Sequence, residues 1–479
     1  MNVNLEEKNQ KRVKGKKELG LDSFGVQKTM RWYHFLGDGA TQLSLNSISG
    51  LIGMLTYFYT DKIGLAAGVV GTILLLTKFI DAFTDLIMGR VVDKTKSKYG
   101  KARPWFLWMS LPMGIMCIAL FCIPQDASNA VKNTYAFITN ILATAIVYTA
   151  VAIPYGCIMA TRTKSISERS TMGIVRSIFG YIAGTVIAIL LIPITNMLGG
   201  NQGAWIKVSV VFGIISFISL LITFFTSKEQ VTEVDMNQAK TKDEEDISFK
   251  ESVVLLFKNK YWVIMLAVML IVNITYSLSG SSGVYYTKYI LQNENLVGIM
   301  GAIGLIPVFI GFSIVGPMIK KFGLSKTVRI SLVVGLLANV VRVFTPYSFI
   351  SAIVCGAFTT FSTIPIMAVG GVLVNNTIEY GELKFGKRII GMTNSASGFG
   401  AKIGSGLGAA MIGWFLALGK YDGTLAVQSQ SAINMILFIC VYLPAILLLV
   451  MYLIFRKYDL DEQYPQIVKE LEERRASKK

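Results

Sequence analysis

Three ionisable residues share one side of an otherwise apolar stretch in the first quarter of the chain. Lys78, Asp81 and Asp85 are spaced at offsets of 3 and 7, which places them on one helical face. Two carboxylates one turn apart repel each other unless a cation or a proton lies between them. We therefore expect a site for Na⁺ or H⁺ at Asp81 and Asp85, where Na⁺ would be the bound metal, and we expect Lys78 to neutralise part of their charge. The alternative is a Lys–Asp pair that only joins helices.

Two further charges lie in apolar surroundings, Asp38 and Lys402. A carboxylate accepts paired hydrogen bonds from hydroxyl groups, so Asp38 can bind a polyol such as a sugar. It can also lie near a helix end and pair with a lysine. Lys402 lies in a glycine-rich stretch without a neighbouring acid, and we expect it to reach toward Asp81 and Asp85. The segment that carries Asp38 has several further polar side chains, which suits a helix facing a wet cavity: Thr41, Gln42, Ser44, Asn46 and Ser47.

Composition indicates that membrane helices must position these charges. Of the 479 residues, 53% are apolar and 16% are charged, and the mean hydropathy is +0.55. A soluble chain has roughly a quarter charged residues, and a membrane helix needs about 20 mostly apolar residues. The sequence predicts an all-α membrane protein with twelve spans. We place them at 35–59, 66–90, 104–124, 135–160, 173–197, 205–226, 261–288, 296–318, 327–346, 349–374, 390–418 and 431–455.

The basic residues alternate between the two sides of these spans. Of the 46 lysines and arginines, 38 lie in the two tails and the even-numbered connections. Positive residues remain on the cytoplasmic side of a membrane. We therefore expect a multi-pass protein of the cytoplasmic membrane with both termini in the cytoplasm. This distribution also explains the net charge of +17 without nucleic acid as a partner.

The longest polar connection divides the chain into two parts with weak internal similarity. The second connection begins at Gly89-Arg90 and the eighth at Gly316-Pro317, and each continues with apolar residues and lysine. Two six-helix repeats around a central cavity are typical of a transporter of the major-facilitator type. The expected organisation is a basic tail, a six-helix bundle, a central loop, a second bundle and a second tail, at residues 1–33, 34–227, 228–260, 261–456 and 457–479.

Several function classes lack their sequence features. His34 is the only histidine, so histidine-based metal clusters are excluded. There is no G-x-x-x-x-G-K-[ST] motif for ATP, and no nucleophile–base pair or metal cluster of a membrane enzyme is evident. We expect no enzyme activity and no cofactor. An ion gradient remains as the energy source.

Two segments resemble the glycoside–pentoside–hexuronide:cation symporters, a family of the major facilitator superfamily. From Asp81 the chain reads DAFTDLIMGRVVDKTKSKYGKARPW, and from Asn375 it reads NNTIEYGELKFGKRIIGMTNSASGFGAKIGSGLG. The D-A-x-x-D-x-x-x-G and E-Y-G-E motifs are fairly specific, and the match runs over nearly the whole chain. The resemblance implies sugar–cation symport by alternating access.

The resemblance also implies roles for single residues. Asp81, Asp85 and Thr149 match the cation site, and Thr84 stands where sodium-using members have asparagine. Asp38 and Arg176 match the sugar site, and Lys402 matches the lysine that links the two sites. Departures from the galactoside-carrying members make melibiose a doubtful substrate: Gly37, Ala152 and Gly156. The candidate faces for stacking on a sugar ring are Tyr148, Tyr155, Tyr276, Tyr285 and Phe361.

We therefore expect a secondary active transporter that carries a sugar or glycoside with Na⁺ or H⁺ and works as a monomer in the lipid bilayer. A carrier of another amphiphile, such as a lysolipid or a drug, is an alternative that a wide apolar cavity would favour. A membrane sugar sensor that does not transport is another alternative, which vesicle uptake would distinguish.

Overall fold

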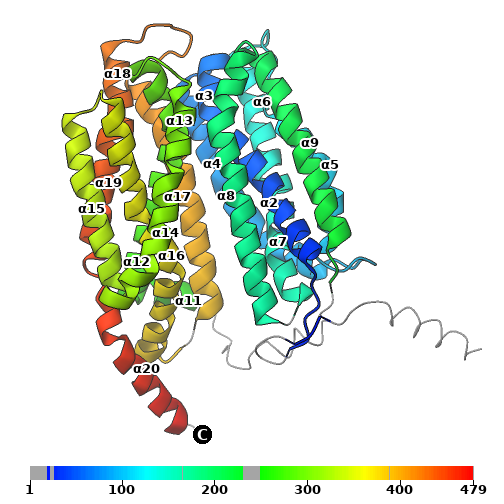
Figure 1. The fold of residues 1–479 in the computed structure, drawn as a ribbon, viewed down its shortest axis with the longest axis vertical. Coiled ribbons are helices and arrows are strands. Elements are labelled where there is room, and N and C mark those ends of the chain that lie inside the picture. Colours follow the sequence, from blue (N-terminus) through cyan, green and yellow to red (C-terminus); the bar gives the residue numbers. More distant parts are fainter. Residues whose placement is uncertain (1–18, 22–25, 164, 230–248, 388, 478–479) are drawn as a thin grey trace, which may run out of the picture.

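The computed structural model describes residues 19–21, 26–163, 165–229, 249–387 and 389–477. All regular elements in these ranges are helices, and most run roughly parallel to one another (Figure 1). The predicted basic N-terminal tail through residue 18, most of the central loop and Arg388 lie outside the described residues.

The helices that precede residue 230 form one group, which we call the N-terminal group. In two of its predicted spans, a π-helical segment, labelled η, adjoins the α-helical segments. The group consists of α2 (Trp32–Gly53), α3 (Leu55–Tyr57), η1 (Phe58–Lys62), α4 (Ala67–Lys94), α5 (Arg103–Ala119), α6 (Asn129–Ile141), η2 (Leu142–Tyr148), α7 (Thr149–Arg162), α8 (Ile166–Met197) and α9 (Gln202–Thr226).

The helices that follow residue 248 form the C-terminal group, which lies beside the first group (Figure 1). The group consists of α11 (Phe249–Lys258), α12 (Lys260–Tyr285), η3 (Tyr286–Ile290), α13 (Leu296–Ile303), α14 (Leu305–Phe322), α15 (Leu324–Phe344), α16 (Phe349–Phe385), α17 (Ile390–Leu418), α18 (Gln430–Leu437), η4 (Phe438–Tyr442), α19 (Leu443–Phe455) and α20 (Leu460–Ser477). We call the end of the molecule with α3, α13 and α18 the α3 end, and the opposite end the α20 end.

Ten helices of the described residues are long and apolar enough to cross a membrane. The predicted all-helical membrane fold is therefore confirmed. The two other predicted spans correspond to α2 and α5. α5 has only 17 residues, and α2 carries the polar side chains that set it apart in the sequence. The total of twelve spans stays a prediction.

Polar residues and glycines mark the ends of the long helices. The side chains of Asn201, Asn259 and Ser348 accept hydrogen bonds from backbone N–H groups in the first turns of α9, α12 and α16. At the other end of α16, Gly386 takes a left-handed conformation with φ of 72°, which favours glycine.

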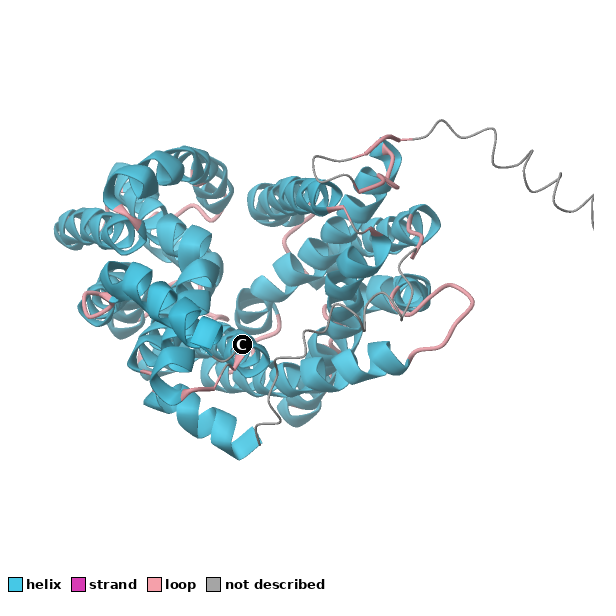
Figure 2. Cartoon of the chain, turned by 90° about the horizontal axis from the view of Figure 1, so that it is seen from below, coloured by secondary structure: helices cyan, strands magenta, loops and turns pink. Residues whose placement is uncertain are grey.

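The two groups meet through glycines in two pairs of helices. On one side α4 lies against α17, where the Cβ position of Gly71 is 2.7 Å from the carbonyl oxygen of Ala410. On the other side α8 lies against α13, where the Cβ position of Gly298 is 2.5 Å from the carbonyl oxygen of Ile189. Small residues let membrane helices approach closely. Viewed from the α20 end, the two groups are separate clusters (Figure 2).

Candidate functional site

The acidic pair of α4 is in contact with a lysine from the other helix group. Nζ of Lys402, on α17, lies 3.0 Å from Oδ1 of Asp81 and 2.5 Å from Oδ2 of Asp85. Lys78 contacts the same cluster from within α4, with its Nζ 3.4 Å from Oδ2 of Asp81. Two carboxylates and two ammonium groups balance in charge, which limits the cost of placing them inside a membrane.

Thr149 joins the two carboxylates from the N-terminus of α7. Its Oγ1 lies 2.9 Å from Oδ1 of Asp81 and 3.0 Å from Oδ1 of Asp85. The backbone carbonyl of Thr144 lies 3.3 Å from the same hydroxyl. A hydroxyl has one proton and can donate it to one acceptor. A proton on one carboxyl group, or a cation between the oxygens, is what would satisfy the second carboxylate contact.

The four residues predicted to form the cation site differ in burial and in their contacts with the two carboxylates. Asp81 is almost fully buried, whereas 27% of the Asp85 side chain is exposed. Thr84 lies on the same helix, but its hydroxyl donates to the backbone carbonyl of Asp81 at 3.0 Å and to neither carboxylate. The structure therefore brings together Asp81, Asp85 and Thr149, and it places Thr84 at their edge.

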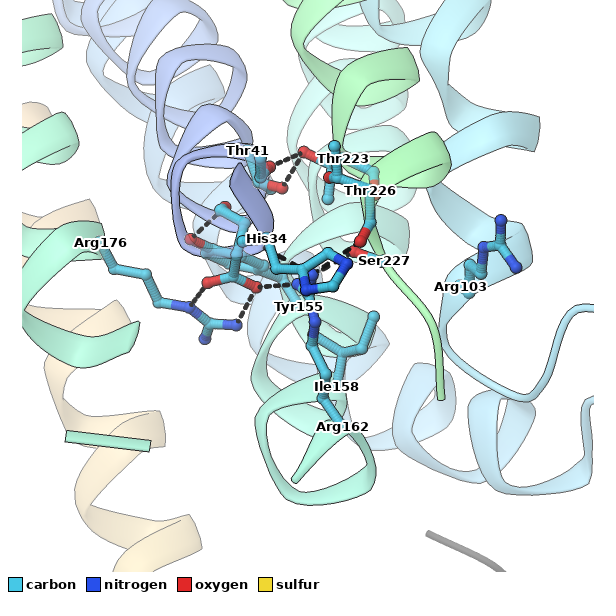
Figure 3. Close-up of polar contacts among 12 residues, drawn as sticks. His34, Thr41, Arg103, Tyr155, Ile158, Arg162, Arg176, Thr223, Thr226 and Ser227 are labelled. Atoms are coloured by element: carbon cyan, nitrogen blue, oxygen red, sulfur yellow. Dashed lines mark hydrogen bonds and ion pairs between the residues drawn. The ribbon is translucent and has the colours of Figure 1, made fainter. Parts of the chain in front are cut away.

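Asp38 is buried and held by two arginines. Nε and Nη2 of Arg176 lie 2.6 and 2.9 Å from Oδ2 and Oδ1 of Asp38, a bidentate ion pair. Nη1 of Arg162 lies 3.5 Å from Oδ1. Figure 3 shows the side chains of Arg176 and Arg162, with their interactions as dashed lines. Asp38 is fully buried between the two arginines. Of these, Arg176 is the more accessible, since 11% of its side chain is exposed and only 2% of the side chain of Arg162 is.

Arg162 also ties together the ends of three helices. It donates to the backbone carbonyls of Thr226 and His34, at 2.8 and 3.2 Å, and to Oγ of Ser227 at 3.2 Å. Arg162 is one of the basic residues of the even-numbered connections, and no role was predicted for it. Its one distinguishing signal is its position at the very end of an apolar stretch.

Tyr155 connects the ion pair of Asp38 with α2. Its hydroxyl donates to the backbone carbonyl of Asp38 at 3.0 Å, and the guanidinium of Arg176 lies 3.7 Å from the centre of its ring. Tyr148, two turns earlier, is in reach of Ser49 and close to the charges of Asp81 and Lys402. The two tyrosines therefore lie at the two charged clusters.

A strip of polar residues on one face of α2 runs between these clusters. The polar strip consists of Gln42, Asn46 and Ser49. Gln42 and Asn46 are partly exposed, and Ser49 is exposed. Nδ2 of Asn46 donates to Oε1 of Gln42 at 2.9 Å. α8 lies against the strip, because the Cβ position of Gly180 is 3.5 Å from that oxygen, an ordinary contact distance. Amides in such a place can donate and accept hydrogen bonds to a hydroxylated ligand.

The other aromatic candidates lie elsewhere. Tyr276 is 65% exposed, and Phe361 is partly exposed on α16. Tyr285 is buried at the α3 end, where its hydroxyl lies 2.8 Å from Oγ1 of Thr60. The structure brings none of these three rings into contact with the charged clusters through an interaction between described residues.

At the α3 end a polar cluster joins the two helix groups. The side chain of Asp61 is fully buried and accepts hydrogen bonds from Nζ of Lys288 at 2.6 Å and from the hydroxyls of Tyr289 and Tyr421 at 3.1 and 2.8 Å. We call these four residues the closing cluster. Beside it, the hydroxyl of Tyr57 donates to Glu294 at 2.6 Å. Lys288 is the last residue of the predicted span 261–288, and no acidic partner was predicted for it.

The two central residues of the closing cluster hold equivalent places in the two helix groups. Tyr59-Thr60-Asp61 lies in η1, at the end of the first predicted span, and Tyr286-Thr287-Lys288 lies in η3, at the end of the seventh. π-helical turns of this kind often occur at functional sites. The acid and the base at these equivalent positions form the ion pair.

Residues 40–462 match a model of the family described as MFS/sugar transport protein. The chain belongs to this family. Family membership confirms the prediction of a secondary transporter of sugars, and it makes the chain a transport protein and not an enzyme. The resemblance to glycoside:cation symporters is confirmed as well, because relatives named as a symporter, an isoprimeverose transporter and a putative glycoside/cation symporter match nearly the whole chain.

Three curated relatives of the family illustrate this match. An uncharacterised symporter of Bacillus subtilis, YnaJ, is 31% identical over 446 residues, which are 91% of this chain and 93% of the relative. The isoprimeverose transporter of Lactiplantibacillus pentosus is 28% identical, over 93% and 91% of the two chains. A putative glycoside/cation symporter of Escherichia coli, YagG, is 28% identical over 88% and 91%.

Solved structures agree on the fold. A bacterial homologue of the human lysosomal transporter Spinster, in an inward-facing and unoccupied conformation, superposes with a TM-score of 0.64 at 12% identity. This match covers 92% of the present chain and 99% of the homologue. The nucleoside transporter NupG superposes with a TM-score of 0.58 at 12% identity, over 89% and 100% of the two chains. The major-facilitator fold is thereby confirmed.

Proposed function

We propose that this transporter carries a sugar or glycoside together with Na⁺ or H⁺ by alternating access. The observation that carries ion coupling is the position of Lys402, whose amine contacts both Asp81 and Asp85. A lysine in this place is a tethered cation from the opposite helix group. A mobile cation that binds the two carboxylates must compete with it, so ion binding and the contact between the groups are linked.

The ion step follows from the charges of this cluster. A proton or Na⁺ at Asp81 and Asp85 would neutralise carboxylate charge and release the amine of Lys402. Thr149 supports this step because its hydroxyl oxygen lies within 3.0 Å of both carboxylates and can accept or donate at either one. Carboxylate, hydroxyl and carbonyl oxygens are also the ligands that hard cations prefer. Thr84 acts indirectly, through the hydrogen bond that its hydroxyl donates to the backbone carbonyl of Asp81.

The sugar step involves the polar strip and the residues around Asp38. The exposed edge of Arg176 and the amides of Gln42 and Asn46 would donate to and accept from the hydroxyls of a sugar. Tyr148 and Tyr155 would contact its ring, and the amine released by Lys402 would complete the site. In this proposal Asp38 orients Arg176, because both of its oxygens are already paired.

The closing cluster supports a state that is closed at the α3 end. We propose that this end faces the outside and that the α20 end and both termini are cytoplasmic, as the basic residues indicate. The proposed molecule has twelve spans in two six-helix halves, lies in the cytoplasmic membrane and acts as a monomer. Opening toward the outside requires the closing cluster to separate.

Uptake into proteoliposomes tests the proposal. The purified chain is reconstituted, and labelled glycosides, pentosides and hexuronides are offered under an imposed Na⁺ gradient, an imposed H⁺ gradient or none. We expect accumulation of one sugar class against its gradient with one of the two ions. Symport is contradicted if accumulation is the same with and without either ion gradient. It is also contradicted if the chain binds sugar but does not move it across the membrane. If the chain takes up a lysolipid and none of the sugars offered, the assignment of a sugar as substrate is wrong.

A further inference from the structure

A groove lies where α4, α6 and α17 meet, next to the closing cluster. Its volume is about 680 Å³, within the range of roughly 300–1,000 Å³ for ligand sites. The first part of α4, from Ala66 to Leu76, supplies most of its wall, and Phe137 of α6 supplies a side. Ala417 of α17 and Tyr421, three residues after that helix ends, supply the wall that belongs to the C-terminal group. Both helix groups therefore form the groove.

The lining of the groove suits a hydrocarbon. None of the described residues in this lining is charged, and its two side-chain hydroxyls are already hydrogen-bonded. The hydroxyl of Thr72 donates to the backbone carbonyl of Gly68 at 2.9 Å and accepts from Nε1 of Trp414 at 3.2 Å. The hydroxyl of Tyr421 lies 2.8 Å from each carboxylate oxygen of Asp61. A sugar placed here would lose hydrogen bonds to water without replacing them, whereas an apolar chain loses none.

The groove is a hollow in a side of the molecule that suits contact with the bilayer. Helical spacing places Val69, Leu76 and Phe79 on the side of α4 that lies opposite Asp81. All three are exposed apolar side chains, and the first two belong to the groove wall. In a membrane-spanning helix, such a face lies against lipid chains, which are as apolar as leucine. A hollow left unfilled there would lose dispersion contacts, so a neighbouring lipid chain is the occupant that this position offers.

We propose that the groove binds one acyl chain of a bilayer phospholipid, and that this chain favours the state in which the closing cluster joins the two groups. The ring of Tyr421 lines the groove while its hydroxyl bonds to Asp61, so the chain packs against a residue that holds the cluster. Separation of the groups at the α3 end would divide the groove, because its two walls belong to different groups. A ligand that binds one of two states shifts the equilibrium toward it, and opening in turn releases the ligand. The bilayer thus takes part in the transport cycle, in addition to the sugar and the ion.

Photolabelling tests whether the groove holds a chain. The full protein is placed in phosphatidylcholine nanodiscs with a trace of phosphatidylcholine that carries a diazirine in the middle of one acyl chain. Labelled residues are located by peptide mass spectrometry after illumination. We expect label on residues 66–76 to exceed severalfold that on Val340 and Val341, two exposed apolar residues of α15.

Variants that fill the groove distinguish a site from ordinary contact with the bilayer. Ala417→Phe and Ala66→Phe place a ring in the groove from its two opposite walls, at exposed positions. Each should lower the labelling of residues 69–76 severalfold, and the use of two walls guards against a variant that does not fold. Val341→Phe is the matched control on α15 and should leave this labelling unchanged. Label that is spread evenly over the exposed faces of α4 and α15, or that neither groove variant lowers, overturns the site.

A variant of the closing cluster tests the link between the chain and closure. Asp61→Asn weakens the cluster without changing the described residues that line the groove. Labelling of the groove should fall severalfold in this variant, and the exchange Asp61→Lys with Lys288→Asp should restore it. Equal labelling in wild type and Asp61→Asn overturns the link.

This test is independent of the proposed function, because labelling requires neither sugar nor ion. A chain that accumulates sugar but shows no preferred labelling of the groove retains symport and loses only the lipid site. A chain that is labelled in the groove but accumulates no sugar keeps the lipid site and contradicts the proposed function.

Discussion

The amine of Lys402 lies 2.5 Å from a carboxylate oxygen of Asp85, although 316 residues separate them in the chain and they belong to different helix groups. This contact makes the acidic pair a junction between the groups as well as the proposed ion site. A charge that enters the pair therefore changes how strongly the groups are held together. The following predictions start from this relationship.

Replacing Lys402 should separate ion binding from sugar movement. In Lys402→Gln the carboxylates lose the tethered cation that contacts both of them, so a free cation competes only with Lys78 and binds more tightly. Sugar exchange down its gradient should continue, whereas accumulation against the gradient should fall by roughly tenfold or more. Counterflow and gradient-driven uptake in proteoliposomes measure the two activities. Equal loss of both activities would show that Lys402 acts only in binding.

The two aspartates should differ in effect because they differ in burial. Asp81 is almost fully buried and contacts Lys78, Lys402 and Thr149, whereas Asp85 keeps 27% of its side chain exposed. Asp81→Asn should abolish gradient-driven accumulation, and Asp85→Asn should weaken it while leaving measurable coupling. Asp126→Asn, at an exposed position of the α5–α6 connection, is the control. Normal accumulation by Asp81→Asn would refute the coupling mechanism.

Thr149 offers a conservative test of the same site. Thr149→Val keeps the shape of the side chain but removes the oxygen that lies near both carboxylates. The ion concentration needed for half-maximal uptake should rise by roughly tenfold, since one hydrogen bond to a charged group is lost. Thr149→Ser retains the oxygen and should behave like wild type. An identical response of the two variants would remove Thr149 from the ion site.

Arg162 should matter more for stability than for sugar binding. Its side chain is 2% exposed and bonds to Asp38, to two backbone carbonyls and to Ser227. Loss of one partner of a buried ion pair costs about 3–5 kcal/mol, although Arg176 still neutralises Asp38 here. Arg162→Gln should therefore lower the midpoint of thermal unfolding. Arg176→Lys, which keeps the charge but not the bidentate geometry, should mainly weaken sugar binding in the same preparation.

Asp61 should control the opening of the α3 end. Asp61→Asn removes the charge that Lys288 binds, so the state open at this end should become more populated. Distances between spin labels at Val131 and Val427, two exposed positions on the two groups, measure the opening. The exchange Asp61→Lys with Lys288→Asp should restore closure. A distance distribution unchanged in Asp61→Asn would show that the cluster does not hold the groups together.

The sequence alone was sufficient for the fold class and for much of the charged cluster that we propose as the ion site. Lys78, Asp81 and Asp85 share a helix, so their helical spacing and their apolar surroundings indicated that they lie together. Lys402 was linked to them because an unpaired intramembrane charge needs an opposite charge. Membership of the family followed from motifs around the same residues.

The contacts that sequence analysis missed depend on tertiary structure. Arg162 and Lys288 lie at the ends of apolar stretches, where a basic residue is usual and carries no special signal. Their acidic partners, Asp38 and Asp61, come from α2 and η1. No local pattern links α2 to α7, and the Tyr-Thr pairs shared by η1 and η3 indicate equivalent positions but do not show that Asp61 and Lys288 are in contact. Likewise, the pairing of Asp38 with Arg162 and Arg176 could not be predicted without the relative positions of α2, α7 and α8.

The ion pair between Asp61 and Lys288 has a consequence for the symmetry of the two helix groups. These residues hold equivalent places in the two groups, so two identical groups would bring aspartate to aspartate or lysine to lysine at this point. Like charges so close repel each other. The attraction at the α3 end therefore requires two groups that differ at this position, and neither group could hold a copy of itself there in the same way.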